Sequence, residues 1–198
     1  MENFWNERYN REEFVYGEQP NEFFKEQLST LIPGKIILPC DGEGRNGVHA
    51  AICGWEVLSF DSSDAGKTKA MRLANSKNVV LKYEIGDATE VEYTENSVDV
   101  VAFIYAHFTP TIRQKIHHKA ISWLKPGGRI ILEAFNPKQL ALNSGGPKDI
   151  ALLYTESILH DDFKDLEIGE LKTCITELKE GKFHEGHAEV IRFVGIKR

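Results

Sequence analysis

The sequence predicts an α/β fold built on a doubly wound, mostly parallel seven-stranded sheet that ends in an antiparallel hairpin. Apolar segments typical of buried strands alternate with helix-compatible segments along most of the chain. The first apolar segment stops at a glycine-rich loop that leads into a helical segment. A short connection, Glu180-Gly181-Lys182, joins two long segments at the end and is typical of a hairpin.

The first half of the chain gives clear start and stop signals. Pro20 opens a helical pattern that Pro33-Gly34 ends, and Asp64 is the expected N-cap of a later helix. Strands are expected where apolar and β-branched residues form short runs bounded by turn residues. We expect strands at residues 35–39, 55–60 and 79–85, and helices at 44–53 and 64–76.

The second half continues the alternation and then changes. Residues 98–105 form a strongly apolar central strand, and Pro110 starts a helix that Pro126-Gly127-Gly128 ends. Residues 129–134 form the fifth strand. After a polar, turn-rich stretch at 136–147 we expect a helix at 155–163 and the hairpin strands at 166–178 and 187–197. With right-handed crossovers, the first five strands are parallel.

Length and composition favour one domain without a nucleic-acid module. The 198 residues fit a single domain. We divide it into an N-terminal lid and helix (1–34), a core (35–135) and a part with a substrate loop, a helix and the hairpin (136–198). The net charge of -6 argues against a nonspecific nucleic-acid surface. Three cysteines without a Cys-x-x-Cys, no secretory signal and no long apolar run predict a cytoplasmic protein with no membrane segment.

The glycine-rich loop indicates the kind of ligand. Gly42, Gly44 and Gly47 satisfy G-x-G-x-x-G, which alone is a weak nucleotide signature. Asp41 and Glu43 lie in the same loop and would repel a pyrophosphate. A ligand without phosphate and with positive charge suits the loop better. S-adenosylmethionine (SAM), which has a sulfonium and an ammonium group, is such a ligand.

Other polar residues follow the neighbouring strands. Asp61 lies 17 residues beyond Gly44, at a distance where a carboxylate can accept hydrogen bonds from ribose hydroxyls. Asp87-Ala88 and Tyr105-Ala106-His107 end the next two strands. In a doubly wound sheet these ends share one crevice, and Asp87 could accept from an adenine amino group. We therefore expect a SAM site there.

Longer segments strengthen this interpretation. FWNERY with VYGEQPNEFF, PCDGEGRNG, VLSFD, IGDA, VVAFIYAHF, LKPGGRIILEAF and NSGGP resemble the class I SAM-dependent methyltransferases of the TehB-like tellurite-resistance and thiopurine-methyltransferase-like group. The resemblance spans essentially the whole chain. It implies SAM as cofactor and the following cofactor-binding residues: Tyr16, Asp41, Gly42, Glu43, Gly44, Arg45, Asn46, Asp61, Ser62, Asp87, Ala88, Tyr105 and Ala106.

The glycine loop departs from the pattern of this group at two positions. Leu38 stands where an acidic residue is common, and Cys40 stands where the first glycine is common. Cys40 places a Cβ at a tight bend, so we expect a small backbone strain there.

Methyl transfer needs a positioned nucleophile and the exclusion of water. His107 is the candidate general base for an oxygen or nitrogen acceptor, and Tyr105 is a candidate catalytic residue or a wall of the pocket. A thiol or chalcogen acceptor needs no base. We expect His184 and His187, which flank the hairpin turn near Cys174, to be surface residues rather than zinc ligands. No metal site is expected.

The resulting prediction is a SAM-dependent methyltransferase with a small-molecule acceptor, no nucleic-acid or membrane partner, and a monomeric or homodimeric state. Two alternatives stay open. One is an NAD(P)-dependent oxidoreductase, suggested by the glycine pattern. The other is a non-catalytic SAM-binding or interaction protein, suggested by Leu38 and Cys40.

Overall fold

The computed structural model describes residues 2–198, with side chains from residue 4 onward, so Met1 of the predicted lid lies outside the described residues. It confirms the predicted fold: one seven-stranded sheet of order β3-β2-β1-β4-β5-β7-β6. Strands β1 to β5 are parallel, and β7 is antiparallel to both β5 and β6. The strands are β1 (Lys35–Pro39), β2 (Glu56–Asp61), β3 (Lys82–Ile85), β4 (Val98–Ile104), β5 (Leu124–Phe135), β6 (Glu167–Lys179) and β7 (Glu185–Ile196).

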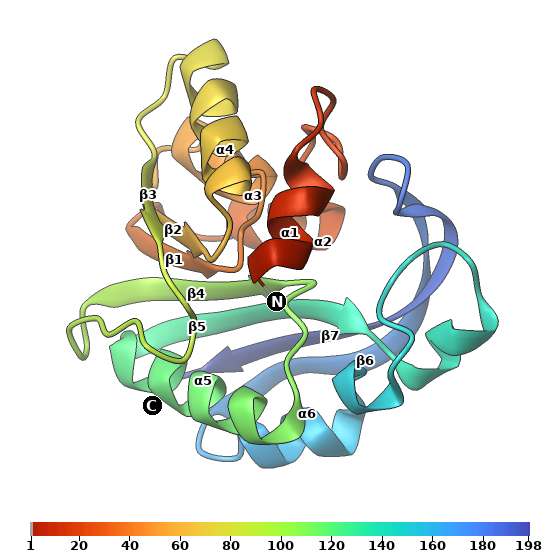
Figure 1. The fold of residues 1–198 in the computed structure, drawn as a ribbon. Coiled ribbons are helices and arrows are strands. Elements are labelled where there is room, and N and C mark those ends of the chain that lie inside the picture. The colour runs from red at the N-terminus through yellow and green to blue at the C-terminus, as the bar shows by residue number, and fades with distance from the viewer. Residues whose placement is uncertain (1) are drawn as a thin grey trace.

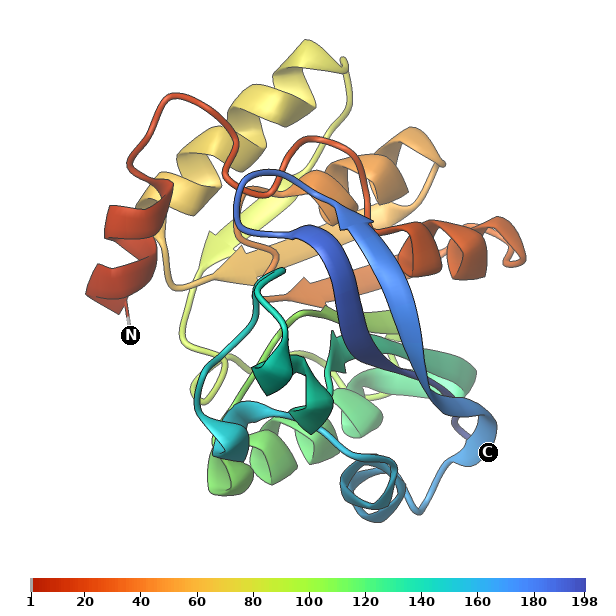
Figure 2. The same ribbon diagram turned by 90° about the vertical axis from the view of Figure 1, so that its right-hand side faces the viewer.

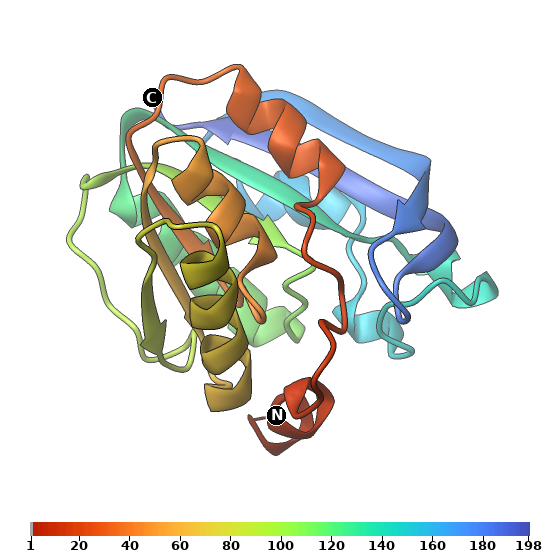
Figure 3. The same ribbon diagram turned by 90° about the horizontal axis from the view of Figure 1, so that it is seen from above.

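Helices cover both faces of the sheet (Figure 1). Helices α2 (Glu22–Ser29), α3 (Arg45–Ile52) and α4 (Asp64–Ser76) lie on one face, where Figure 3 shows them side by side. Helices α5 (Pro110–Trp123) and α6 (Glu156–Asp162) lie on the other face. Each face has its own core, one around Phe24 and Leu73 and one around Phe103 and Trp123. The parallel strands β1, β2, β4 and β5 are therefore buried on both faces, whereas the edge strand β6 is mostly exposed or half-buried.

Several helix boundaries follow local chemistry. Asn21 caps α2 by accepting a hydrogen bond from the Phe24 amide, and Thr155 caps α6. The predicted cap of α4 was wrong. The Ser63 hydroxyl, rather than Asp64, accepts from the Gly66 amide, and Asp64 occupies the first helical turn. There its negative charge suits the positive end of the helix dipole.

Three stretches differ from the sequence-based prediction. Strand β5 begins at Leu124, ahead of the Pro-Gly-Gly segment, because Leu124 pairs with Val98. In addition, the Gly127 amide donates to the Lys197 carbonyl, and the Gly128 carbonyl accepts from the Lys197 amide. The N-terminus forms an additional helix, α1 (Glu2–Tyr9), which packs on α4. A short 3₁₀ turn, η1 (Pro137–Ala141), interrupts the predicted polar loop, and a second one, η2 (Ile150–Leu152), follows it.

The terminal hairpin reaches beyond the sheet. Since β7 runs antiparallel to β5, the turn between β6 and β7 lies at the edge where β5 ends, which is also the edge of the glycine-rich loop. Figure 2 shows this hairpin rising beside the chain that links α1 to α2. A Cβ on Gly181 in the turn would lie 2.6 Å from the Val15 carbonyl oxygen, so the two segments are in close contact. The hairpin thus forms a side wall above the strand ends.

Among the described helices, none combines the length and the apolar character that crossing a membrane requires.

Candidate functional site

A cavity of about 1090 Å³ lies at the carboxyl ends of the parallel strands. It is larger than the ~300–1,000 Å³ of most ligand pockets, so it has room for two small molecules. Of the predicted site residues, all but Gly44 line it, including His107. The strand order reverses between β1 and β4, and the cavity lies at that switch point. The convergence expected from the sequence is therefore present.

Two strained residues border the cavity. Cys40 has a φ of 56° and Tyr105 a φ of 54°, both in the left-handed region that glycine favours. Each follows the end of a strand, β1 for Cys40 and β4 for Tyr105. The strain expected at Cys40 is confirmed. The left-handed conformation turns the backbone sharply into the cavity at the end of each of these two neighbouring strands. Backbone strain of this kind is found mainly at functional sites.

Gly44 has a packing role. It has a φ of 82°, and a Cβ there would lie 2.4 Å from the Cβ of Ala70 on α4. Only glycine allows α3 and α4 to approach this closely. Gly44 therefore shapes the loop from outside the cavity.

Asp41 is a half-buried carboxylate with an unsatisfied oxygen. Its Oδ2 accepts hydrogen bonds from the Ser59 hydroxyl (2.7 Å) and the Gly47 amide (3.2 Å). Its Oδ1 is buried and has no partner among the described residues. Burial raises the pKa of Asp41 to about 7, although these two hydrogen bonds lower it. A cationic ligand group would satisfy the orphaned oxygen and favour the ionised form.

Asp61 and Asp87 differ in their surroundings. Asp61 is buried, and its two oxygens accept from the amides of Gly42 (3.1 Å) and Ser63 (2.9 Å). Burial raises the pKa of Asp61, and the amide bonds oppose this shift. Asp87 is exposed, and hydrogen bonds from the Thr89 hydroxyl and amide lower its pKa. Both carboxylates lie at the rim of the same cavity.

Glu43 supports the N-terminal segment. It is 4% exposed, forms an ion pair with Lys69 of α4, and accepts hydrogen bonds from the amides of Val15 (2.8 Å) and Tyr16 (3.2 Å). Its charge is therefore neutralised within the protein. Of the two acidic residues of the loop, Asp41 alone is therefore left to repel a phosphate.

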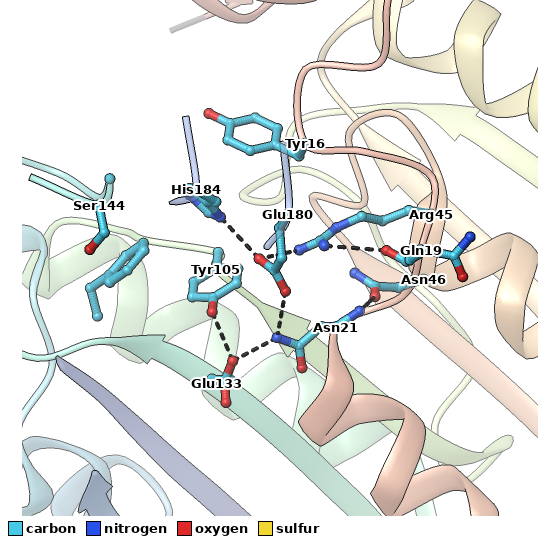
Figure 4. Close-up of polar contacts among 12 residues, drawn as sticks. Tyr16, Gln19, Asn21, Arg45, Asn46, Tyr105, Glu133, Ser144, Glu180 and His184 are labelled. Carbon is cyan, nitrogen blue, oxygen red and sulfur yellow. Dashed lines mark hydrogen bonds and ion pairs between the residues drawn. The ribbon is translucent and has the colours of Figure 1, made fainter. Parts of the chain in front are cut away.

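The first turn of α3 tethers two other segments. Arg45 is 7% exposed and forms an ion pair with Glu180 of the hairpin turn, with 2.9 Å between Nη2 and Oε2. The Asn46 side-chain oxygen accepts from the Asn21 amide at 2.9 Å. Figure 4 shows these side chains pointing toward one another. Both residues line the cavity while holding its walls together.

Tyr105 is part of the wall. Its hydroxyl donates to Glu133 at 2.8 Å, and its ring stacks on Phe135 at 4.7 Å between centroids. Burial raises the pKa of Tyr105 well above its usual value, and Glu133 adds to this shift. A neutral phenol that donates to a buried carboxylate is a fixed surface rather than a base.

His107 has both ring nitrogens engaged. Nδ1 lies 2.7 Å from the Leu152 carbonyl oxygen, so it carries the proton and donates, and Nε2 accepts from the Phe135 amide at 3.3 Å. Burial lowers the pKa of His107 to about 4, although the bond to Leu152 opposes this shift. The ring joins three segments around the cavity. Its hydrogen bonds leave neither ring nitrogen free to take a proton from a methyl acceptor.

The expectation that His184 is a surface residue was wrong. His184 is 7% exposed, lines the cavity and lies 3.1 Å from Glu180. His187 is exposed, as expected. The difference arises because His184 lies at the turn that bends over the strand ends, whereas His187 lies on the outer face of β7. No group of three or more potential metal-ligating side chains occurs within the described part of the chain.

Comparisons with known proteins agree with this geometry. Residues 39–128 match the family described as a methyltransferase domain. Over 191 residues, 90% of this chain and 36% of the relative, the sequence is 26% identical to phosphoethanolamine N-methyltransferase 1 of Triticum aestivum. The chain spans little more than a third of the length of the curated relatives it matches.

Solved structures show the same fold at low identity. TehB from Haemophilus influenzae matches with a TM-score of 0.74 at 16% identity, covering 100% of this chain and 67% of that one. Magnesium protoporphyrin IX methyltransferase from Synechocystis PCC 6803, solved with bound SAH, matches with a TM-score of 0.71 at 15% identity, covering 99% and 93%. Residues 39–128 thus match a methyltransferase domain, and the chain has the fold of class I methyltransferases.

Proposed function

We propose that this protein transfers the methyl group of SAM to a small-molecule acceptor, within a TehB-like group of methyltransferases. The observation that carries the proposal is the joint position of Asp41, Gly42 and Asp61 at one end of a cavity with room for a second molecule. Asp61 is held by the Gly42 amide, so the loop and the carboxylate form one rigid unit. SAM supplies an activated methyl group when it is bound.

The cofactor residues divide by the part of SAM that each would hold. Asp61, with Ser62 beside it, receives the ribose hydroxyls. Asp87 and Ala88 contact the adenine, and Gly42 with Asp41 faces the amino-acid moiety. The orphaned Oδ1 of Asp41 supports this assignment, because the SAM ammonium supplies the missing donor. Asp41 thereby takes over the role of the acidic residue that Leu38 replaces.

The acceptor occupies the side of the cavity that the lid segments cover. Tyr16, the rings of Tyr105 and Phe135, and Gly145 of the 136–147 loop line that side. Glu43 and Lys69 hold the N-terminal segment over the loop, which keeps water away from the reacting atoms. Tyr105 and Ala106 form the floor near the methyl group. Such an enclosed site suits a small acceptor and excludes a folded nucleic acid.

His107 acts by positioning rather than as a base in this proposal. Its two hydrogen bonds fix the backbone at Leu152 and Phe135, and so set the shape of the acceptor wall. Replacing it with Gln should raise KM for the acceptor more than it lowers kcat, without a change in the pH profile of kcat.

Binding measurements test the cofactor assignment. S-adenosylhomocysteine (SAH) at about 100 times its Kd should stabilise the protein by about 2.7 kcal/mol, whereas NADH should not. The variant Asp61→Asn should weaken SAH binding at least ~10-fold, since a neutral amide is a poorer acceptor for the ribose hydroxyls. The matched control is Asp99→Asn, a carboxylate at the opposite edge of the sheet. Stabilisation by NADH and not by SAH would favour the oxidoreductase alternative.

A further inference from the structure

The turn of the terminal hairpin brings a carboxylate and a histidine together at the acceptor side of the cavity. Glu180 and His184 lie on opposite sides of the turn, with 3.1 Å between the Glu180 Oε2 and the His184 Nδ1. Figure 4 shows the pair between Tyr16 and Tyr105. Both side chains are largely buried, with 12% of the Glu180 side chain and 8% of the His184 side chain exposed.

Glu180 is held on several sides. Besides His184, it accepts from Arg45 of α3 at 2.9 Å and from the Asn21 side-chain amide at 3.2 Å. Burial would raise the pKa of Glu180, but the bonds from His184 and Arg45 outweigh it and lower the pKa to about 2. Glu180 is therefore ionised and acceptor-only at neutral pH, so His184 Nδ1 must carry the proton that the two share.

This arrangement leaves His184 Nε2 as the lone-pair nitrogen. The described residues provide no hydrogen-bond partner for it, although the residue is 93% removed from solvent and borders the cavity. Three aromatic rings surround the imidazole: Tyr16 at 4.6 Å, Tyr105 at 4.7 Å and Phe135 at 5.2 Å between centroids. Because Nε2 is open to the cavity rather than sealed inside its wall, a ligand in the cavity can donate a hydrogen to it.

Burial, more than the neighbouring charges, keeps the ring neutral. Burial lowers the pKa of His184. Glu180, on the same hairpin, opposes this shift, while Arg45 of α3 and Arg8 of α1 add to it. Tyr16 and Tyr105 are the other titratable groups against the ring, and burial raises the pKa of both, so they stay uncharged. The imidazole is therefore in its basic form at neutral pH.

We propose that His184 is the general base of this site, that Glu180 is its positioning residue, and that the acceptor is a flat molecule with a phenolic O–H or a ring N–H. This inference rests on the proposed methyl-transfer function. The aromatic walls fit a planar body, and the free Nε2 fits an acidic hydrogen. A thiolate or chalcogen anion would have no use for such a base.

The proton and electron balance is simple. The acceptor O–H or N–H bond breaks, and its proton goes to His184 Nε2. The electron pair left on the oxygen or nitrogen forms the new bond to the methyl carbon. The carbon–sulfur bond breaks, and its electrons stay on sulfur, which becomes the neutral thioether of SAH. Imidazolium next to the Glu180 carboxylate then releases the proton to solvent.

Comparing two methyl acceptors of different acidity tests whether His184 acts as a general base. The probes are 4-hydroxybenzoate and other simple phenols and hydroxypyridines, with thiophenol as an acceptor that is already largely ionised at neutral pH. In the full-length protein, His184→Gln should lower kcat for the phenolic probe by ~10²–10⁴-fold. Transfer to thiophenol should change less than ~5-fold. The matched control is His187→Gln, an exposed histidine three residues along the same hairpin.

The pH profile tests the role of Glu180. Wild-type kcat for the phenol should rise along an acidic limb and level off by neutral pH. In Glu180→Gln the imidazole loses the partner that raises its pKa, so the limb should move to lower pH while the plateau falls, because the tautomer is no longer fixed. Glu180→Asp should restore part of the plateau. A purely structural role would lower the plateau for phenol and thiophenol alike and leave the limb in place.

Each outcome decides between the two levels of the proposal. Selective loss of phenol transfer in His184→Gln supports the base. Equal rates in wild type and His184→Gln overturn it and leave methyl transfer intact, as does wild-type transfer to thiophenol only. If SAH binds but no probe is methylated, the proposed function fails and the base assignment falls with it.

Discussion

Arg45 and Glu180, which lie 135 residues apart in the sequence, form a buried ion pair with 2.9 Å between Nη2 and Oε2. Arg45 belongs to the first turn after the glycine-rich loop, and Glu180 to the turn of the terminal hairpin. The pair therefore joins the glycine-rich end of the cavity to the hairpin that forms its side wall. The same carboxylate is hydrogen-bonded to His184, so the ion pair also connects the loop to that histidine.

Breaking this pair should destabilise the protein. Replacing Arg45 with Met leaves Glu180 buried without its cation, which should cost about 3–5 kcal/mol in the free energy of unfolding. Urea unfolding measures this change. The control is Lys25→Met, which removes the exposed pair with Glu22 and should cost less than about 1 kcal/mol. Equal effects of the two substitutions would show that the buried pair does not secure the hairpin.

Glu180 should also make stability depend on pH. Its pKa of about 2 in the folded protein lies below the ordinary 4.5. The stability that it contributes is therefore fully present above pH 4.5, and it is lost as the pH falls toward 2. The free energy of unfolding of wild type minus that of Glu180→Gln, measured by urea titration at several pH values, should fall across this window. A constant difference would contradict the assigned shift.

Asp41 should have the opposite pH dependence. Burial raises its pKa to about 7, so its contribution to stability is greatest below pH 3.8 and is lost as the pH rises through 7. Without ligand, Asp41→Asn should gain stability relative to wild type over this range, as thermal unfolding at pH 5 and pH 8 would show. The same variant should bind SAH at least ~10-fold more weakly at pH 8. Unchanged SAH affinity would separate Asp41 from the cofactor ammonium.

Alanine substitutions at two glycines with the same backbone conformation distinguish the cost of backbone strain from the cost of a packing clash. Gly44 and Gly127 have φ values of 82° and 81°, but a Cβ at Gly44 would meet Ala70 at 2.4 Å, whereas nothing lies within 4 Å at Gly127. Gly127→Ala should cost about 1 kcal/mol from backbone strain alone. Gly44→Ala should cost at least ~2 kcal/mol more, because α3 and α4 must separate. Similar costs measured by chemical unfolding would mean that the helices adjust freely.

The lid depends on Glu43. Glu43→Gln weakens the ion pair with Lys69 and the bonds to the amides of Val15 and Tyr16. Hydrogen exchange in residues 10–21 should therefore rise at least ~10-fold, while exchange in β4 stays unchanged. SAH should partly restore the protection. Unaltered exchange in residues 10–21 would show that other contacts hold the lid.

The strand pattern of this chain was predictable because buried parallel strands are short apolar runs with clear ends. The apolar run that ends in Tyr105 and the one before Cys40 both led directly to cavity residues. The helix α1 and the start of β5 at Leu124 were not predictable, because tertiary contacts with α4 and with the end of the chain decide them. Ser63 and Asp64 are both good caps, and local sequence did not separate them.

The site was predictable where it follows strand ends and was missed where it depends on the hairpin. From the sequence, His184 is expected to be a turn residue, because Gly181 precedes it and Gly186 follows it. Its position near the cavity could have been predicted from the topology, because a strand antiparallel to β5 must begin at the edge where β5 ends. The roles of Glu43 and Arg45 were not visible in the sequence. Their partners, Lys69 and Glu180, are brought to them only by folding.

The most direct measurement is the stoichiometry of methyl transfer. Purified protein is incubated with SAM and the panel of phenol, hydroxypyridine and thiophenol acceptors, and SAH and methylated product are quantified by mass spectrometry, with Asp61→Asn as the comparison. We expect equal amounts of SAH and methylated acceptor, and at least ~10-fold less of both with Asp61→Asn at SAM concentrations below the wild-type Kd. SAM that remains intact with every acceptor, while the protein binds SAH, would contradict this expectation.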